Sequence, residues 1–414
     1  MRWANNPDAA LAQEWIAALD AHIRAQGLRG WDPFDIKQHP WIRAAQTRPL
    51  LRKASSGLCD LFPTFTRRLL HIAPTENPKA FALVALGALR LYETFGEESW
   101  RTLAIAQLDW LEQHISPGYA GPCWGYPFDI KAVGLETPKG TPVLVVSAIA
   151  GFAFLQAHAV LGEPRYFEIA RGIADFVLKD LAPIPNENGT YCIPYTPTDK
   201  RRVHNANLLG TELVVRVAAQ TGERDLINHA LPAIRFTLRH QHEDGKWNYG
   251  EHRAGEPYER EILEFVDHFH TGFVLRSLHG IAAALPSEHT ALREECVAAL
   301  KKGFAFYKEQ LHTGAYFQPK NLHIRWVDIH MCAESVLCPS VVKDIVMPAR
   351  GMATQCIKWA WWDLRDHQTS LPWYRKYPWF TSRITFPRWG VAWMYFALAE
   401  YLYQHRDLLD DKGE

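Results

Sequence analysis

Three histidines of this chain lie at the start of runs of small and apolar residues, which are typical of buried helices. They are His204 in His-Asn-Ala-Asn-Leu-Leu-Gly, His270 in Asp-His-Phe-His-Thr-Gly and His330 in Asp-Ile-His-Met-Cys. An imidazole takes up and releases protons near neutral pH, which suits it to general acid/base catalysis. A single histidine at a helix start is usually a satisfied structural residue. Three at equivalent positions predict acid/base chemistry.

Aspartates precede two of these histidines. Asp267 and Asp328 are either N-caps, which accept backbone N–H bonds at a helix start, or catalytic acids. Glycoside hydrolysis needs two carboxyl groups about 5 to 10 Å apart. Glu251 and Asp129 are further acids available for such a pair, and the sequence does not rank the pairs. A glycoside hydrolase is therefore an alternative function.

Arginines near the end of the chain indicate a charged ligand. Arg383 and Arg388 stand among aromatic residues that include Trp389. A guanidinium in such surroundings needs an anion, and a carboxylate or phosphate of a substrate would serve. The substrate that we expect is an oligo- or polysaccharide with anionic groups, such as uronic acids.

Proton abstraction beside the carboxylate of a uronic acid leads to C5-epimerisation or to β-elimination. It needs a cation for the carboxylate, a base on one face of the sugar and an acid on the other. His204 or His270 is the candidate base. Tyr249 or Tyr374 is the candidate acid, and Asn205 would hydrogen-bond the enolate-like oxygen. We prefer this function, because histidine, tyrosine and arginine are more plentiful at these positions than unpaired carboxylates.

Aromatic turns recur between the predicted helices and include Trp124 and Trp247. Flat rings stack on the apolar faces of sugars, so these residues are candidates for substrate binding. Alternatively they fill the core. A non-catalytic glycan-binding or scaffold protein would also keep them, which leaves that class as a further alternative.

We predict no metal and no cofactor. His268 and His270 are two residues apart and would not face each other on a helix, and the sequence has no His-Glu-x-x-His motif. The basic run from Lys200 to Arg202 is expected to be a solvated surface.

Helical hairpins of about 55 to 70 residues repeat along the chain. Gly-Glu turns at 96, 162 and 222 end one helix and start the next, since glycine adopts the left-handed conformation and an acid suits a helix N-terminus. Charged outer helices are expected over 99–114, 163–179, 223–240 and 287–310. Less charged inner helices are expected over 78–95, 141–161, 204–220, 267–284, 328–338 and 388–404.

These two sets of helices predict an all-α fold, an (α/α)6 toroid of six hairpins in one domain over residues 1–414. Residues 1–76 would be an N-terminal extension that completes the ring, beginning with a helix over 7–26. The bulky aromatic turns favour this closed ring over an open solenoid or two helical domains. Loops before the inner helices would then bring 204, 270, 330 and 388 to one cavity.

Composition narrows the function classes. The 45 Lys and Arg residues balance 45 Asp and Glu, which argues against a nucleic-acid binder. Seven scattered cysteines and the lack of a signal peptide predict a cytoplasmic protein with reduced thiols. The most apolar stretch, 142–160, contains Ser147, Gln156 and His158, so we expect a buried helix and no membrane span. The oligomeric state is not predicted.

Several motifs, in their order along the chain, resemble a bacterial family of helical-toroid proteins encoded in exopolysaccharide and lipopolysaccharide assembly clusters, of the Vibrio-polysaccharide J type. The resemblance implies a six-hairpin fold and a role in polysaccharide biosynthesis, without a settled reaction. This chain departs from the family pattern at Asp-Ile-Lys37. The motifs are Gly30-Trp-Asp-Pro-Phe-Asp, Asn77-Pro-Lys79, His204-Asn-Ala-Asn-Leu-Leu-Gly, Asp244-Gly-Lys-Trp-Asn-Tyr-Gly-Glu251, Asp267-His-Phe-His-Thr-Gly272, Asp328-Ile-His330, and Tyr374-Arg-Lys-Tyr through Arg388-Trp-Gly.

Overall fold

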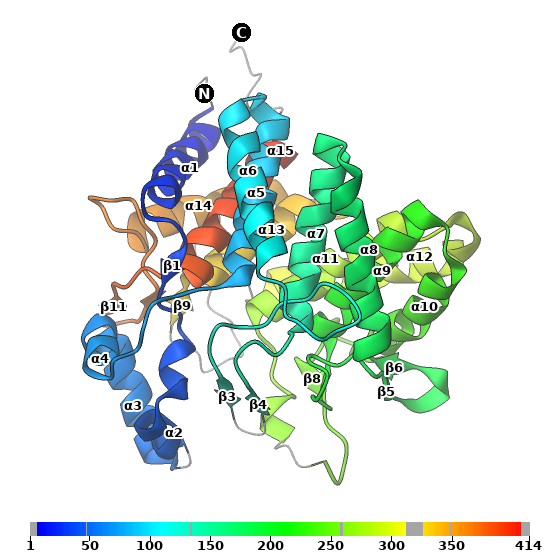
Figure 1. Ribbon diagram of the computed structural model, residues 1–414, viewed down its shortest axis with the longest axis horizontal. Coiled ribbons are helices and arrows are strands. Elements are labelled where there is room, and N and C mark those ends of the chain that lie inside the picture. The colour runs from blue at the N-terminus through cyan, green and yellow to red at the C-terminus, as the bar shows by residue number, and fades with distance from the viewer. Residues whose placement is uncertain are drawn as a thin grey trace.

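Six inner helices form a closed ring in the described part of the chain. The computed structural model describes residues 6–46, 48–132, 135–256, 260–311, 326–347 and 349–406. Each inner helix packs against the inner helices beside it, and the last packs against the first (Figure 1). The predicted (α/α)6 toroid is confirmed. The inner helices are α5 (Pro78–Phe95), α7 (Leu144–Leu161), α9 (His204–Thr221), α11 (His268–Ala284), α13 (Ile329–Val341) and α15 (Trp393–Gln404).

An outer helix packs against each inner helix of the described chain. Five outer helices directly follow their inner partners, whereas α1, at the N-terminal end, packs against α15. The outer helices are α6 (Glu98–Gln113), α8 (Pro164–Asp180), α10 (Arg224–Arg239), α12 (Thr290–Phe306), α14 (Ala349–Asp363) and α1 (Pro7–Gln26).

The chain turns from inner to outer helix at the predicted glycines. Gly96, Gly162 and Gly222 each adopt the left-handed conformation, with φ of 71°, 73° and 72°. Each donates its backbone N–H to a carbonyl of the preceding turn, which satisfies one of the unpaired carbonyls at the helix end. The predicted Gly-Glu turns are therefore confirmed.

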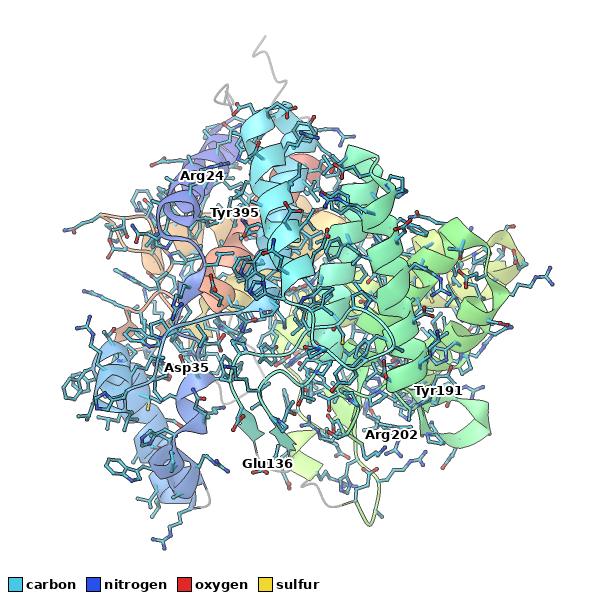
Figure 2. All side chains as sticks on the ribbon, in the orientation of Figure 1. Arg24, Asp35, Glu136, Tyr191, Arg202 and Tyr395 are labelled. Atoms are coloured by element: carbon cyan, nitrogen blue, oxygen red, sulfur yellow. The ribbon has the colours of Figure 1, made fainter. Side chains whose placement is uncertain are left out.

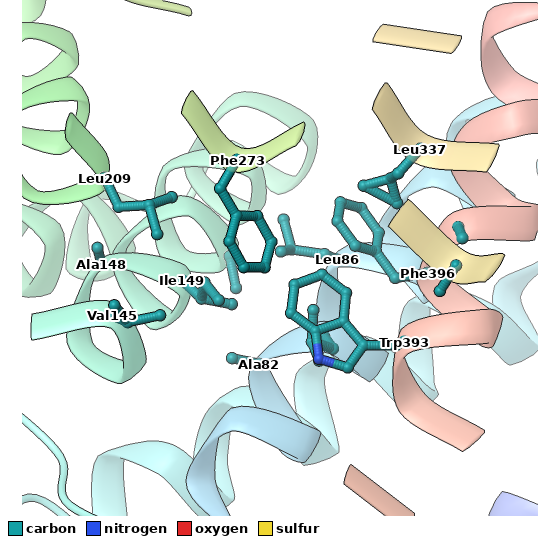
Figure 3. Packing of buried hydrophobic residues seen from close by; sticks show 14 of the residues in the cluster. Ala82, Leu86, Val145, Ala148, Ile149, Leu209, Phe273, Leu337, Trp393 and Phe396 are labelled. Carbon is teal, nitrogen blue, oxygen red and sulfur yellow. The ribbon is translucent and has the colours of Figure 1, made fainter. Parts of the chain in front are cut away.

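The centre of the ring is filled by apolar side chains from all six inner helices (Figure 3). Leu86, Leu209 and Phe273 meet Leu337 and Trp393 there. The ring therefore encloses a packed core rather than a channel. By length and composition alone α7 is apolar enough to cross a membrane, but it packs between α5 and α9 and 67 % of it is buried.

Asp20 of α1 joins the N-terminal helix to α15. The Tyr395 hydroxyl donates to Asp20 Oδ1 at 3.0 Å, and Arg24 Nε lies 2.6 Å from Asp20 Oδ2 (Figure 2). Trp15 is fully buried and its Nε1 donates to the Ser370 carbonyl at 2.9 Å. The start of the chain is thus built into the packing of its last helices.

Three helices extend from one corner of the ring and were not predicted from the sequence. They are α2 (Pro40–Gln46), α3 (Pro49–Leu61) and α4 (Pro63–Leu69). Proline begins each of them, and α2 and α4, of seven residues each, are too short for a clear hydrophobic period. Helix α14 was also missed. The predicted helix 388–404 begins instead as a π-helical turn, Pro387–Ala392, which leads into α15.

Short strands tie the loops together at the end of the ring where the inner helices begin. Their pairing brings distant loops together, as where β1 and β2 place the 30–35 loop beside the start of α5. The pairs are β1 (Arg29–Gly30) with β2 (Thr75–Glu76), β3 (Ile130–Ala132) with β4 (Leu135–Thr137), β5 (Ile184–Pro185) with β6 (Tyr191–Cys192), β7 (Arg202–Val203) with β8 (Gly250–Glu251), and β10 (Arg375–Lys376) with both β9 (Val327–Asp328) and β11 (Thr381–Ser382). The predicted aromatic turn at 314–319 lies outside the described residues.

Candidate functional site

A cavity of about 340 Å³ lies at the end of the ring where the inner helices begin. The start of every inner helix contributes a lining residue, with Arg388 coming from the π-helical turn before α15. Three of the four positions that were expected to converge, 270, 330 and 388, line this cavity, and 204 does not. The six contributed residues are Lys79, Val145, Asn205, His270, His330 and Arg388.

His270 is oriented by a carboxylate. Its Nδ1 lies 2.7 Å from Asp267 Oδ2, while Asp267 Oδ1 accepts the backbone N–H of His270 at 3.0 Å. A carboxylate only accepts hydrogen bonds, so Nδ1 carries a proton, and in the neutral imidazole Nε2 keeps a lone pair. Asp267 therefore caps α11 and also fixes the tautomer of the histidine. No atom of the described residues hydrogen-bonds His270 Nε2.

His330 is a buried histidine in aromatic surroundings. Its ring lies 4.4 Å from Trp389, 4.6 Å from Phe269 and 4.7 Å from Trp393, measured between ring centroids. Neither ring nitrogen has a hydrogen-bond partner among the described residues. Burial, helped by the nearby charges of Lys79 and Arg388, holds the pKa of His330 well below its usual value of 6.5. His330 is therefore neutral at pH 7.

Arg388 already has an anion within the protein. Its Nε and Nη2 donate to the two oxygens of Asp32 at 2.5 and 2.7 Å, and both side chains are buried. Asp32 stands in the loop that follows β1 and also accepts the backbone N–H of Phe34 at 3.0 Å. The sequence-based inference that Arg388 needs a substrate anion is wrong in this respect, because its charge is compensated by a residue 356 positions away.

Lys79 is a buried cation of the cavity, and no carboxylate of the described residues lies within salt-bridge distance of it. Its side chain is 5 % exposed. Its Nζ lies 5.5 Å from the centre of the Tyr126 ring. Burial lowers the pKa of Lys79 and the charge of Arg388 lowers it further, while Tyr126 and the carboxylate of Asp32 raise it. An anion bound beside Lys79 would further stabilise the ammonium form, because it would supply the close counter-charge that the described residues lack.

Tyrosines form much of the cavity wall. Burial raises the pKa of both Tyr195 and Tyr249, so their hydroxyls stay protonated and can donate hydrogen bonds. The Tyr249 ring lies 4.5 Å from the His270 ring between centroids. Tyr249 therefore lies on the same wall as His270 rather than opposite it. Asn205 adds a buried Oδ1 atom with no hydrogen-bond partner among the described residues.

His204 and Glu251 pair with each other outside this cavity. His204 Nε2 lies 2.9 Å from Glu251 Oε1 and His204 Nδ1 lies 3.2 Å from Thr237 Oγ1. Both ring nitrogens are thus engaged and the ring is buried. The pairing of β7 with β8 causes this arrangement, since it places Glu251 opposite Arg202 in the ladder.

Two predicted aromatic platforms belong to the core. Trp124 and Trp247 are buried, and their Nε1 atoms donate to the carbonyls of Leu111 and Thr237 at 3.0 and 2.9 Å. They present no surface to a ligand, so the alternative that they fill the core holds. Trp389 differs, because it lines the cavity beside His330.

The remaining predicted site residues lie away from the cavity. Asp328 caps α13 by accepting the Met331 N–H at 3.0 Å and is 3.4 Å from Arg375 Nη2. Tyr374 borders a neighbouring pocket. Asp129 accepts the Lys139 N–H at 2.9 Å. Arg383 is exposed and lies over the Trp373 ring.

The basic run after Lys200 was also misjudged. Arg201 and Arg202 are buried rather than solvated. Arg201 lines the cavity and is paired with Asp199 at 2.7 Å. Arg202 is paired with Glu256.

Sequence reasoning missed Lys79, Lys37, Tyr126, Tyr195 and Asp32 as residues of this site. A signal existed for Lys79, because it is a lysine in the first turn of an inner helix, two positions after the N-cap Asn77, and the residues from 80 to 89 that follow it are all apolar. No local signal existed for Asp32. It contacts Arg388 because the pairing of β1 with β2 positions its loop, and the sequence around Asp32 does not show this pairing.

The described residues contain no group of three or more His, Cys, Asp or Glu side chains that is placed to hold a metal ion. All seven cysteines are free thiols. The polar chemistry of the cavity in the described chain comes from imidazole, phenol, amide, ammonium and guanidinium groups.

Comparison with solved structures finds this fold in several enzymes. A sugar epimerase from a ruminal bacterium is 10 % identical, with a TM-score of 0.60 over 80 % of this chain and 88 % of that one. A GH76 α-mannanase from Bacteroides thetaiotaomicron is 11 % identical, with a TM-score of 0.60 over 98 % of both chains. A family 88 glycosyl hydrolase from Bacteroides vulgatus is 10 % identical, with a TM-score of 0.56 over 81 % of this chain and 94 % of that one.

No protein-family model matches the chain, and no curated protein sequence matches it significantly. Identities of this size show a shared fold and leave the reaction to be argued from the site. The chain has the six-hairpin (α/α)6 toroid fold that these epimerases and glycoside hydrolases share.

Proposed function

We propose that this protein is a carbohydrate-active enzyme that abstracts a proton beside the carboxylate of a uronic acid in a glycan. The observation that carries the proposal is the buried Lys79, which lacks a carboxylate partner among the described residues and lines the same cavity as the His270–Asp267 pair. A cation without a counter-ion favours an anionic ligand. A histidine with a free Nε2 supplies the base.

The reaction follows from these groups. Lys79 binds the sugar carboxylate and stabilises the negative charge that develops on it when the C5–H bond breaks. His270 Nε2 takes the proton, and Asp267 stabilises the imidazolium that forms, through its contact with Nδ1. Return of a proton to the other face of C5 gives the epimer, whereas loss of the C4 substituent with its bonding electrons gives a 4,5-unsaturated sugar.

Neutral groups would position the sugar. His330 and Asn205 have buried polar atoms without hydrogen-bond partners among the described residues, and sugar hydroxyls can donate hydrogen bonds to these atoms or accept hydrogen bonds from them. Trp389 and Phe269 offer ring faces in the same cavity for the apolar side of a pyranose. The protonated hydroxyl of Tyr195 is a candidate for returning the proton, in place of Tyr249, which lies on the wall of the base.

Paired carboxylates do not carry the proposal. No Asp or Glu is among the described residues that line the cavity. The acids next to its lining residues are engaged, Asp32 by Arg388 and Asp267 by His270. Hydrolysis by two free carboxyl groups therefore has no support from the described residues of this cavity.

The cellular setting is also part of the proposal. The resemblance to proteins of exopolysaccharide and lipopolysaccharide assembly clusters supports a role in polysaccharide biosynthesis. Free thiols at all seven cysteines support a cytoplasmic location. We further propose that residues 1–414 fold as one domain in which residues 1–76 complete the ring.

Incubation with uronic-acid glycans in D2O tests the reaction. We expect deuterium at C5, with or without new absorbance at 232 nm that reports β-elimination. His270→Gln should lower the rate by about 10²- to 10⁴-fold, since it removes the base. Lys79→Met should raise KM for uronic-acid glycans and lower kcat, because the charge it neutralises grows in the transition state.

Control variants outside the cavity show whether a loss of activity is specific to the cavity residues. His279→Gln lies on the same helix but away from the cavity, beside Asp344, and should keep wild-type activity. Lys301→Met, an exposed lysine, should do the same. Absence of C5 exchange with every uronic-acid glycan, or an unchanged rate in His270→Gln, would contradict the proposal.

A further inference from the structure

Exposed apolar side chains are concentrated on helices α2 to α4. Eight of the twelve large hydrophobic residues that are exposed in the described chain lie between residues 41 and 69. Leu50 is 82 % exposed, Trp41 75 % and Phe65 64 %. We call the side of α2–α4 formed by these residues, with Leu58, Phe62 and Leu69, the apolar face.

Helical spacing groups the apolar residues within α3 and within α4. In α3, Leu51, Leu58 and Leu61 are seven and three residues apart, and in α4, Phe65 and Leu69 are four apart; these spacings place side chains on one face of a helix. The opposite side holds the extension to the ring. Arg67 Nε lies 2.9 Å from Asp35 Oδ1, and Arg67 Nη2 donates to the Asp32 carbonyl at 2.8 Å.

A second anchor lies on α3, where Asp60 is 3.2 Å from Arg375 Nη1. Because these anchors are polar and partly or fully buried, the apolar face is not needed to hold the extension in place. Soluble proteins rarely expose a contiguous apolar surface of this kind unless it contacts a partner or a membrane.

The charge of the extension indicates whether the apolar face contacts a protein partner or a membrane. Residues 40–71 contain six Lys or Arg and one acid, Asp60. Arg48 and Arg68 are exposed. A second copy of this chain would bring like charges together across a two-fold contact, because such an interface places the same surface on both sides. An anionic lipid surface is complementary to both the basic residues and the apolar side chains.

We propose that the apolar face inserts into the surface of a bilayer that contains anionic phospholipids. Tryptophan, phenylalanine and leucine would enter the boundary between headgroups and acyl chains, while exposed arginines contact the lipid phosphates. No helix of the extension spans the bilayer in this arrangement. The docking itself does not depend on the proposed reaction.

The apolar face lies at the end of the molecule that holds the cavity. In Figure 1, α2, α3 and α4 lie in the lower part of the molecule, as do the short strands β3, β4 and β8. Cys59 and Asp60 of α3 border a pocket of about 180 Å³. Phe34 and Lys37 line both this pocket and the cavity. Docking would therefore hold the cavity close to the lipid surface, where a glycan carried on a membrane lipid can reach it.

Vesicle sedimentation of the full-length protein tests the docking. We expect binding to vesicles of phosphatidylcholine with phosphatidylglycerol and much weaker binding to phosphatidylcholine alone. The double variant Leu58→Glu/Phe65→Glu should bind at least ~10-fold more weakly. Arg48→Gln/Arg68→Gln should lose about fivefold per residue, and added salt should weaken binding of the wild type.

The control is Met347→Glu/Trp362→Glu, which changes two apolar residues elsewhere that are at least as exposed as Leu58 and Phe65. It should bind as the wild type does. Circular dichroism checks that each variant is folded, and the salt dependence of the wild type is a second readout that needs no variant.

Two results would overturn the proposal. One is the absence of wild-type binding to anionic vesicles, or equal loss in the control variant. The other is a dimer in sedimentation analysis that Leu58→Glu/Phe65→Glu dissociates, without vesicle binding by the wild type, since the apolar face would then contact a second copy.

Discussion

At the scale of residues, the cationic side chains of the cavity differ in whether a carboxylate of the protein compensates their charge. Arg388 and Arg201 both line the cavity, yet each is paired with a carboxylate of the protein. Lys79 is equally buried and has no such partner among the described residues. Aromatic surroundings alone predicted a substrate anion for Arg388, whereas we propose that Lys79 binds it.

The pair between Asp32 and Arg388 should be strongly coupled. Asp32→Asn leaves a buried guanidinium without its counter-charge, which costs about 3–5 kcal/mol of folding free energy. Asp32→Asn/Arg388→Met should be less destabilised than the sum of its single variants, because it removes both charges. Urea unfolding of the four proteins measures this coupling. Additive effects would mean that the two groups do not interact.

His330 should make stability depend on pH. Its pKa is lowered in the folded protein, so the unfolded chain binds a proton below about pH 6.5 while the folded chain does not. Stability is therefore full above pH 6.5 and falls as the pH drops toward the folded pKa. In His330→Gln, the slope of unfolding free energy against pH between 6 and 5 should be smaller, by at most about 1.4 kcal/mol per pH unit. Equal slopes in the two proteins would contradict a neutral buried His330.

At the scale of elements, periodicity predicted most of the ring. Inner helices were found because a helix buried on most sides has few charges, as α7 has none. The extension α2–α4 escaped because α2 and α4 are only seven residues long and because all three helices lie outside the repeated hairpins. The strand pairs escaped because two-residue ladders have no period of their own. Part of the site was predicted, because the starts of the inner helices meet at one end of a toroid. Asp32 was not predicted, because it reaches Arg388 from a loop that lies far away in the sequence.

Close packing of inner helices depends on small residues. A Cβ atom on Gly272 of α11 would lie 2.5 Å from Glu334 Cγ of α13, whose carboxylate is held by Arg276 at 2.8 Å. Gly272→Ala should lose about 1–3 kcal/mol of stability through this clash. Gly351→Ala in α14 meets open space and should gain about 0.5–1 kcal/mol through helix propensity. Thermal unfolding compares them, and a neutral Gly272→Ala would show that the helices can move apart.

At the scale of the whole molecule, the ring is closed by contacts between its two ends. Helix α1 packs on α15, and Arg90 of α5 lies 2.7 Å from Glu400 of α15. Closure places the first and last helix starts of the ring, with Lys79 and Arg388, on one cavity. The site therefore depends on the complete ring rather than on any one hairpin.

The contribution of the N-terminal helix can be measured at one residue. Trp15 is fully buried, with its ring 5.6 Å from Trp361 between centroids. Trp15→Ala should cost about 3–5 kcal/mol, as large-to-small changes in a core do. Trp41→Ala, at a tryptophan that is 75 % exposed, should change stability by less than about 0.5 kcal/mol. Similar small effects in both variants would show that α1 is not part of the folded core.

A crystal structure with a bound uronic-acid oligosaccharide tests the proposed site most directly. We predict the sugar in the cavity, with a carboxylate oxygen about 2.7–3.2 Å from Lys79 Nζ and with C5 facing His270 Nε2. A sugar bound outside the cavity, or one whose carboxylate points away from Lys79, would contradict the account.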